Sequence, residues 1–346
     1  MRSSSAAGLE RMVALAAELP TALVRGFRAG RELDAPPVAG ERPVFAAGMG
    51  ASGVAAELAR GLVEAEASAP LVVVRGADLP RAAAAPATVL LLSYSGATTE
   101  AIRAYHAAGR LGARRIVVTS GGPLADRADA DGAPVLRVPA GRPPRAAVGD
   151  LLGAVLGVLD PLFPESNEAR LERAATAVAE QIPRIGAPGG PAADLAKVVG
   201  DRFPFVVAER SFAALARRWK SQIEENAKRL AVFDEIPELL HNSVVGWDAL
   251  RPREARRYAL LLLEWSAAAP LARQADRYLL RLGRARGTAA VRVPLPPEDR
   301  LSALVHGIAL GDHLSFELAR RAGVDPVPIP AIDRTRAALA ATDPGE

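Results

Sequence analysis

The chain has 346 residues, of which half are hydrophobic and 24% charged, a composition typical of a folded globular protein with room for two domains. It contains no cysteine, which excludes disulfides, thiolate metal ligands and a cysteine nucleophile, and fits a cytoplasmic location. The net charge is +4, but bases and acids are mixed along the chain and aromatics make up only 4%, so no nucleic-acid partner is expected. No apolar run is long enough to span a membrane, and residues 1–20 predict an amphipathic helix and not a signal peptide.

The first half of the chain alternates short apolar runs with helical patterns. Strands are predicted at 42–48, 71–76, 87–95, 114–120 and 133–139. Apolar strands that alternate with amphipathic helices indicate a parallel, doubly wound sheet. A helical stretch follows at about 146–186, and a Pro/Gly-rich segment at 183–194 is the predicted linker.

The same pattern returns in the second half. It has strands at 203–209 and 288–294, further apolar runs at 243–248 and 258–264, and a long helix over 301–323 that ends at a glycine. We therefore predict the α/β class, with two doubly wound parallel-sheet (flavodoxin-like αβα) domains. The expected domains are residues 1–155 and 195–346, with a helical connection and linker at 156–194.

The segment from Trp219 to Trp247 concentrates residue types that the chain otherwise avoids. Only three of the 43 basic residues are lysines, and two of them, Lys220 and Lys228, lie here. A Glu-Glu-Asn run and His241, one of four histidines, lie here as well. A composition biased toward Ala, Arg, Pro and Gly would replace such residues where they did not matter, so this segment is predicted to carry a functional site.

A glycine-rich turn follows the first predicted strand. Gly48, Gly50 and Gly53 satisfy the G-x-G-x-x-G pattern between a strand and a helix. A dinucleotide site would next require an acid at the end of the second strand, but that strand ends at Arg75. NAD is therefore disfavoured, whereas Arg75 leaves NADP open. A turn that only packs helix against strand is the structural alternative.

A second loop, after the third predicted strand, is rich in hydroxyl groups. Ser93, Ser95 and Thr98 surround a glycine at the start of a helix, where backbone N–H groups and the helix dipole favour an anion. Ser52, after the first strand, is expected at the same edge of the sheet. These residues predict a phosphate site without a lysine; a Ser/Thr-capped helix start is the alternative.

Five segments in this order resemble the bifunctional phosphoglucose/phosphomannose isomerases, a branch of the sugar isomerase (SIS) fold. They are GMGASG, LLSYSGATTEAI, PPRAAVGDLL, RRWKSQIEENAK and PELLHNSVVGW, and a C-terminal segment from 306 to 339 extends the likeness over nearly the whole chain. The resemblance implies two SIS domains, a homodimer and no metal or cofactor. It also implies interconversion of fructose 6-phosphate with glucose 6-phosphate and mannose 6-phosphate through a cis-enediol or enediolate.

The resemblance also implies roles for individual residues. Glu225 corresponds to the base that moves a proton between C1 and C2, and Arg145 to the arginine that stabilises the enediolate. His241 corresponds to the ring-opening histidine, which is contributed by the neighbouring subunit. Glu224 is the neighbour that competes for Glu225's role, and one step along a helix allows only one of the two to face the site. The implied phosphate ligands are Gly50, Ser52, Ser93, Ser95 and Thr98.

The chain departs from the family pattern at three positions. Arg336 stands where a lysine is usual, which keeps the charge but makes a poor proton donor. Ala51 replaces a second glycine, and Ala97 replaces an asparagine. Ala51, Thr335 and His306 are expected to line the pocket. The choice between glucose and mannose phosphates is expected to depend on the shape of the pocket near Thr335 and Arg336.

Two other functions remain open from the sequence. A non-catalytic SIS module that binds a sugar phosphate and regulates a partner would need only the phosphate loops. An NADP-dependent oxidoreductase would leave the hydroxyl-rich loop without a role. His306 and His313 share a helix face, but no third ligand accompanies them, so no metal site is expected.

Overall fold

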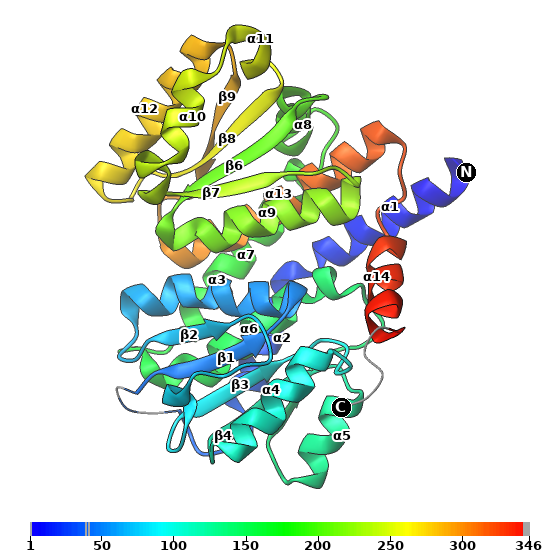
Figure 1. Cartoon of the computed structure of the whole chain (residues 1–346), viewed down its shortest axis with the longest axis vertical. Helices are drawn as coiled ribbons and strands as arrows, with labels where there is room; N and C mark the ends of the chain where they lie inside the picture. Colours follow the sequence, from blue (N-terminus) through cyan, green and yellow to red (C-terminus); the bar gives the residue numbers. More distant parts are fainter. Residues whose placement is uncertain (1, 39, 41, 342–346) are drawn as a thin grey trace.

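Two parallel β-sheets, one in each half of the chain, form the framework of the molecule (Figure 1). The computed structural model describes residues 2–38, 40 and 42–341. The first sheet has the order β2 (Leu71–Val74), β1 (Val44–Gly48), β3 (Thr88–Leu92), β4 (Arg114–Thr119) and β5 (Val135–Arg137). Every residue of β1 and β3 is buried, which explains why these central strands are uninterrupted apolar runs.

The strand order reverses between β1 and β3, which lie side by side with Gly48 opposite Leu92. In an open α/β sheet, this switch point leaves a crevice at the carboxyl ends of the strands. The loops that lead from β1 into α3 (Gly50–Glu66) and from β3 into α4 (Thr99–Arg110) therefore meet at one edge. The other helices that precede residue 160 are α1 (Arg2–Ala17), α2 (Leu19–Arg31), α5 (Pro123–Ala130) and α6 (Val148–Leu159).

The second sheet has four strands in the order β7 (Val232–Ile236), β6 (Phe203–Glu209), β8 (Tyr258–Trp265) and β9 (Ala289–Leu295). The prediction of two parallel-sheet α/β units is thus confirmed. One detail differs: the apolar run at 243–248 is helix α10 (Ser243–Ala249), and the sheet is completed by β7. Because β7 is a partly exposed edge strand with two acidic residues, its sequence lacks the apolar pattern of a buried strand.

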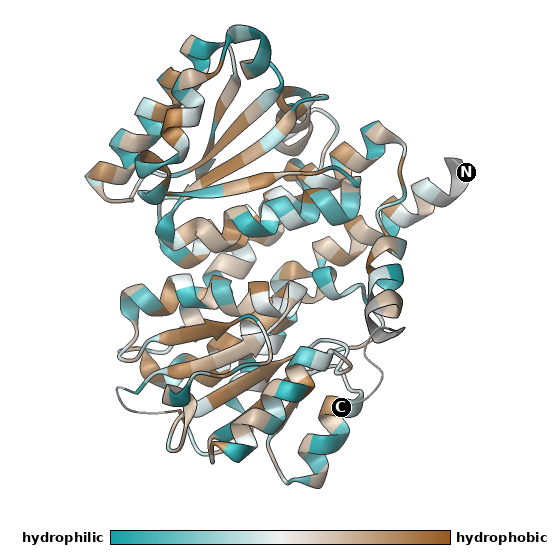
Figure 2. Cartoon of the chain, in the orientation of Figure 1, coloured by the Kyte–Doolittle hydropathy of each residue, from teal (hydrophilic) through white to brown (hydrophobic). Residues whose placement is uncertain are grey.

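Helices α3, α7 (Glu168–Ile185), α9 (Ala213–Ala227) and α13 (Arg300–Ala322) lie between the two sheets (Figure 1). One apolar core cluster includes buried residues from both sheets and from these helices, and Figure 2 shows the strands of both sheets largely in brown. The remaining helices are α8 (Pro191–Val199), α11 (Pro252–Ala255), α12 (Pro270–Arg286) and α14 (Pro330–Ala341). Within the described ranges, no helix is both long and apolar enough to cross a membrane.

Helices α2 and α6 pack against each other through glycines. A Cβ added at Gly153 would lie 2.2 Å from the carbonyl oxygen of Leu23, and one added at Gly26 would lie 2.3 Å from that of Asp150. Added Cβ atoms at Gly157 and Gly30 would lie 2.1 and 2.5 Å from carbonyl oxygens of the facing helix, and one at Gly149 would lie 2.9 Å from Ala22 Cβ. The backbones of the two helices therefore touch directly, which leaves no room for a side chain at these positions.

Candidate active site

The loops after β1 and β3 are joined by a hydrogen bond across the switch point. The backbone N–H of Tyr94 donates to Ser52 Oγ at 3.0 Å, and both residues are buried. Within the second loop, Ser93 Oγ donates to Thr98 Oγ1 at 3.0 Å, and Ser95 Oγ accepts from the N–H of Ala97 at 3.3 Å. The hydroxyl groups therefore gather around the start of α4, as the sequence predicted.

The backbone conformation of this second loop depends on Gly96. We expect that replacement of Gly96 by alanine disrupts the loop. The φ of Gly96 is +64°, and an added Cβ would lie 1.7 Å from the carbonyl oxygen of Gly121. Gly132 is a matched control, since its φ is +65° and a Cβ there would meet nothing within 4 Å. Gly132→Ala should cost only the left-handed strain of about 1–2 kcal/mol, whereas Gly96→Ala should cost more and also weaken binding of inorganic phosphate. Urea unfolding and phosphate calorimetry test this, and equal results for both variants would contradict it.

Tyr94 connects the hydroxyl-rich loop to the segment that carries Arg145. Its hydroxyl donates to the carbonyl of Pro139 at 3.0 Å and accepts the N–H of Arg142 at 3.1 Å. Arg145 follows in a short 3-10 helix, Pro144–Ala147, and only 2% of it is exposed. Burial lowers the pKa of the Arg145 guanidinium, and the nearby charge of Glu225 opposes this shift.

Glu225 lies on α9, and its Oε2 is 3.5 Å from Arg145 Nη1. Burial raises the pKa of Glu225, while Arg145, Arg218 and Lys228 pull it back only in part. A carboxyl group of this kind holds its proton at a higher pH than an exposed glutamate, which makes its carboxylate form a stronger base.

Glu224, the competing neighbour, points elsewhere. Its carboxylate forms an ion pair with Lys220 at 2.6 Å, one turn earlier on α9, and accepts the N–H of Ala231 at 3.5 Å. Of the two glutamates, only Glu225 lines the cavity described next. The two side chains therefore point in different directions, as expected for consecutive residues of a helix.

A cavity of about 230 Å³ lies between the two domains and brings Glu225 and Arg145 together with the first loop. Gly50 and Ala51, which precede Ser52, line one side of it, and α9 lines the other. Its remaining lining residues are Val54, Arg75, Arg217, Arg218, Lys220, Ser221, Gln222 and Phe233. Five of the lining residues are cationic and one is anionic, so the cavity suits a negatively charged ligand.

Two of these arginines, Arg75 and Arg217, form ion pairs with a buried glutamate beside the cavity. Glu57 on α3 is 8% exposed and pairs with Arg75 Nε at 2.5 Å and Arg217 Nε at 3.3 Å. Arg75 follows β2 in the first domain, whereas Arg217 lies on α9 in the second. From the sequence, Arg75 was the residue that left an NADP site possible. In the structure it shares Glu57 with Arg217, and the three side chains join the two domains.

Seven predicted site residues do not line this cavity, and an eighth, Arg336, cannot be placed. Four of the seven are the predicted phosphate ligands Ser52, Ser93, Ser95 and Thr98. His241 is exposed and does not line the cavity. His306 lies in another cavity, of about 590 Å³, where its Nδ1 is 2.5 Å from Gln181 Oε1. Thr335 is exposed on α14 and donates to the carbonyl of Ala331 at 2.9 Å. Arg336 is part of α14, but its side chain lies outside the described residues.

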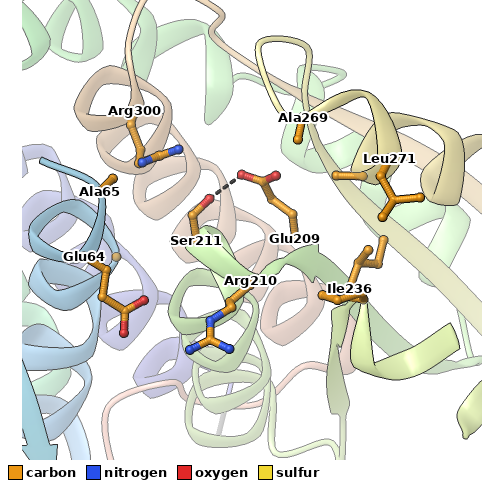
Figure 3. Close-up of a pocket in the computed structure, with 12 residues that line it drawn as sticks. Glu64, Ala65, Glu209, Arg210, Ser211, Ile236, Ala269, Leu271 and Arg300 are labelled. Atoms are coloured by element: carbon orange, nitrogen blue, oxygen red, sulfur yellow. Dashed lines mark hydrogen bonds between the residues drawn. The ribbon is translucent and has the colours of Figure 1, made fainter. Parts of the chain in front are cut away.

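The second sheet has no hydroxyl-rich loop at its own switch point, between β6 and β8. Figure 3 shows the pocket there, of about 380 Å³, in which Glu209 and Ser211 are hydrogen-bonded to each other between Arg300 and Leu271. A carboxylate therefore stands where the first domain has its hydroxyl-rich loop. The two domains share a fold, but only the first has the groups expected to hold a phosphate.

Sequence reasoning missed the buried polar residues that surround Arg145. Asn226 and Arg218 are 0% and 2% exposed, and Arg218 Nη2 donates to both carboxylate oxygens of Asp312 at 2.8 Å. Lys228 ends α9 with φ +55° and donates from Nζ to the backbone carbonyls of Glu225 and Pro326. The rarity of lysine and the Glu-Glu-Asn run were signals for two of these residues, but nothing in the sequence distinguished Arg218 from the other arginines.

Comparisons with known proteins agree with this picture. Residues 189–339 match the family described as "Bacterial phospho-glucose isomerase C-terminal SIS domain". The bifunctional phosphoglucose/phosphomannose isomerase of Aquifex aeolicus is 29% identical, over 84% of this chain and 88% of the relative. The enzyme of the same name from Caldicellulosiruptor bescii is also 29% identical, over 86% of this chain and 89% of the relative. In fold, the tagatose-6-phosphate ketose/aldose isomerase of Escherichia coli has a TM-score of 0.66 at 14% identity, covering 93% of this chain and 96% of that one.

The fold and the site together define a two-domain protein of the sugar isomerase (SIS) class. Within this class, the chain is similar over most of its length to enzymes named bifunctional phosphoglucose/phosphomannose isomerase.

Proposed function

We propose that this protein is an aldose–ketose isomerase that interconverts fructose 6-phosphate with glucose 6-phosphate and mannose 6-phosphate. The observation that supports this most directly is the cavity in which Glu225 and Arg145 lie 3.5 Å apart beside Gly50 and Ala51 of the first phosphate loop. A regulatory module would need the loops alone, so the buried base and its guanidinium partner favour an enzyme. The names of the homologues favour the same reaction.

The chemistry follows from these groups. The loops at Ser52 and at Ser93–Thr98, within residues 1–155, would hold the phosphate and so fix the distance to the reacting carbons. Glu225, within residues 195–346, would take the proton from C2 of the aldose and return it to C1, while a proton passes from O2 to O1. Arg145 Nη1 would hydrogen-bond the enediolate oxygen while its charge develops. No step in this scheme requires a metal or a cofactor.

A coupled assay with fructose 6-phosphate tests this proposal. Glucose 6-phosphate and mannose 6-phosphate are followed separately, in the presence of EDTA. Formation of both products supports the bifunctional reaction, and formation of one narrows the specificity. Binding of fructose 6-phosphate without turnover would instead favour a regulatory SIS protein.

We further propose that the active form is a homodimer, in which His241 enters the site of the neighbouring subunit as the acid that opens the sugar ring. Its exposed position outside its own subunit's cavity supports this arrangement. Glu225→Gln and His241→Ala should each be inactive alone, yet mixed dimers should contain one intact site. Random mixing should then restore about a quarter of the wild-type activity, because half of the dimers are mixed and each has one working site of two. No recovery after verified subunit exchange would contradict the shared site.

A further inference from the structure

The Arg145 guanidinium is held by two of its three nitrogen atoms. Nε donates to Asn226 Oδ1 at 2.7 Å, and Nη2 donates to the carbonyls of Pro326 and Val327 at 2.5 and 3.1 Å. The third, Nη1, is buried, has no hydrogen-bond partner among the described residues and lies beside Glu225 at the cavity. Arg145 belongs to the first domain, whereas all of these partners come from the second half of the chain.

The orientation of the Asn226 amide follows from its surroundings. Ser315 Oγ donates its hydrogen to the carbonyl of Asp312 at 2.6 Å, so it acts as the acceptor toward Asn226 Nδ2 at 2.9 Å. With its N–H group on the Ser315 side, the amide must present Oδ1 to Arg145. Because Asn226 is completely buried, water cannot replace this acceptor.

Asn226 and Glu225 are consecutive residues of α9, and one helical step turns their side chains about 100° apart. Glu225 therefore faces the cavity while Asn226 faces the core. The same helix thus carries the predicted base and the amide that holds its guanidinium partner. The other acceptors, Pro326 and Val327, lie on the loop between α13 and α14.

We infer that Asn226 is a positioning residue, which holds Arg145 so that Nη1 alone remains free to bind one oxygen of the reacting sugar. This inference rests on the proposed isomerase function. A guanidinium held at Nε and Nη2 cannot offer the two-pronged fork that binds a phosphate, whereas a single free donor suits one developing oxyanion.

The test is Asn226→Ala, with Asn167→Ala as the matched control. Asn167 is also buried, at 7% exposed, but its amide donates to Asp160 in another part of the molecule. Asn226→Ala should lower kcat by about 10- to 100-fold with KM within about threefold, because the phosphate loops are untouched. It should also move the acid limb of the kcat profile to higher pH, since a displaced Arg145 no longer favours ionised Glu225. Asn167→Ala should leave both quantities unchanged.

An NMR measurement reads the position of Arg145 even if the isomerase proposal fails. The Nε–H signal of Arg145, assigned by its loss in Arg145→Lys, should exchange slowly with water in the wild type and in Asn167→Ala. It should exchange quickly in Asn226→Ala and faster than wild type in Ser315→Ala, which loses the group that orients the amide. Ser315→Ala decides the matter if Asn226→Ala does not fold. Unchanged exchange in the folded variant, or a kcat profile like that of Asn167→Ala, would overturn the inference.

Discussion

Replacement of Glu225 by glutamine should lower kcat for fructose 6-phosphate by about 10²- to 10⁴-fold, which is the usual contribution of a positioned general base. The amide has nearly the same shape but cannot accept the C–H proton. KM should change little, because the proposed phosphate ligands are residues other than Glu225. Initial rates for both aldose products, measured with the purified variant, provide the test.

The neighbouring glutamate supplies the control for this prediction. Glu224→Gln changes the same side chain one position away, but Glu224 pairs with Lys220 and does not line the cavity. It should keep kcat within about threefold of the wild type, since it loses a partly exposed ion pair and the glutamine oxygen can still accept the N–H of Ala231. If Glu224→Gln were the inactive variant, or if both variants were fully active, the assignment of Glu225 as the base would be wrong.

The pH dependence of the wild type follows from the same site. Burial raises the pKa of Glu225 above its usual range, so the ionised base should be lost as pH falls through that raised value. The acid limb of kcat/KM should therefore lie above the ordinary glutamate pKa of about 4.3. An acid limb at or below that value would show that another group is the base.

Asp276→Asn should stabilise the protein above pH 7. Asp276 lies on α12, is 2% exposed, and its Oδ1 has no hydrogen-bond partner among the described residues. Burial, together with the charges of Glu264 and Glu209, raises its pKa to about 7. The asparagine avoids the buried charge, although its amide remains poorly paired. The expected gain in the free energy of unfolding at pH 8 is therefore on the order of 1–3 kcal/mol.

The raised pKa of Asp276 determines the pH range in which this residue destabilises the protein. The folded state keeps the Asp276 proton up to about pH 7, whereas the unfolded state releases it near the ordinary aspartate pKa of 3.8. Stability is therefore lost as pH rises between these values and the loss is complete above pH 7. The advantage of Asp276→Asn should vanish near pH 4. Urea unfolding at pH 4, 6 and 8 measures this. Asp248→Asn, at an exposed ion pair with Arg286, is the control and should show little dependence on pH.

The parts of the site that local sequence defines could be predicted, and those that depend on long-range contacts could not. The loop from Ser93 to Thr98 follows a buried strand and opens a helix, so its position could be inferred from neighbouring residues alone. The bond between Arg145 and Asn226 joins residues 81 positions apart and in different domains. No local pattern specifies such a pairing, because many buried amides could accept from an arginine.

The same distinction applies to the fold. The strands at 44–48 and 88–92 are buried on both faces and so have uniform apolar sequences. Strand β7 is held at the sheet edge by backbone pairing with β6, and its side chains are only partly buried. Backbone pairing alone does not require a particular pattern of side chains. For this reason the sequence did not predict β7, an edge strand with acidic residues.

The contact between α2 and α6 has a consequence for how this chain can evolve. Glycine and alanine codons differ by one base, and the composition of the chain shows that alanine is readily accepted elsewhere. At Gly26, Gly30, Gly149, Gly153 and Gly157, however, a single methyl group would collide with the facing helix. These two helices should therefore be among the slowest-changing parts of the sequence, although they contribute no residue to the cavity between the domains.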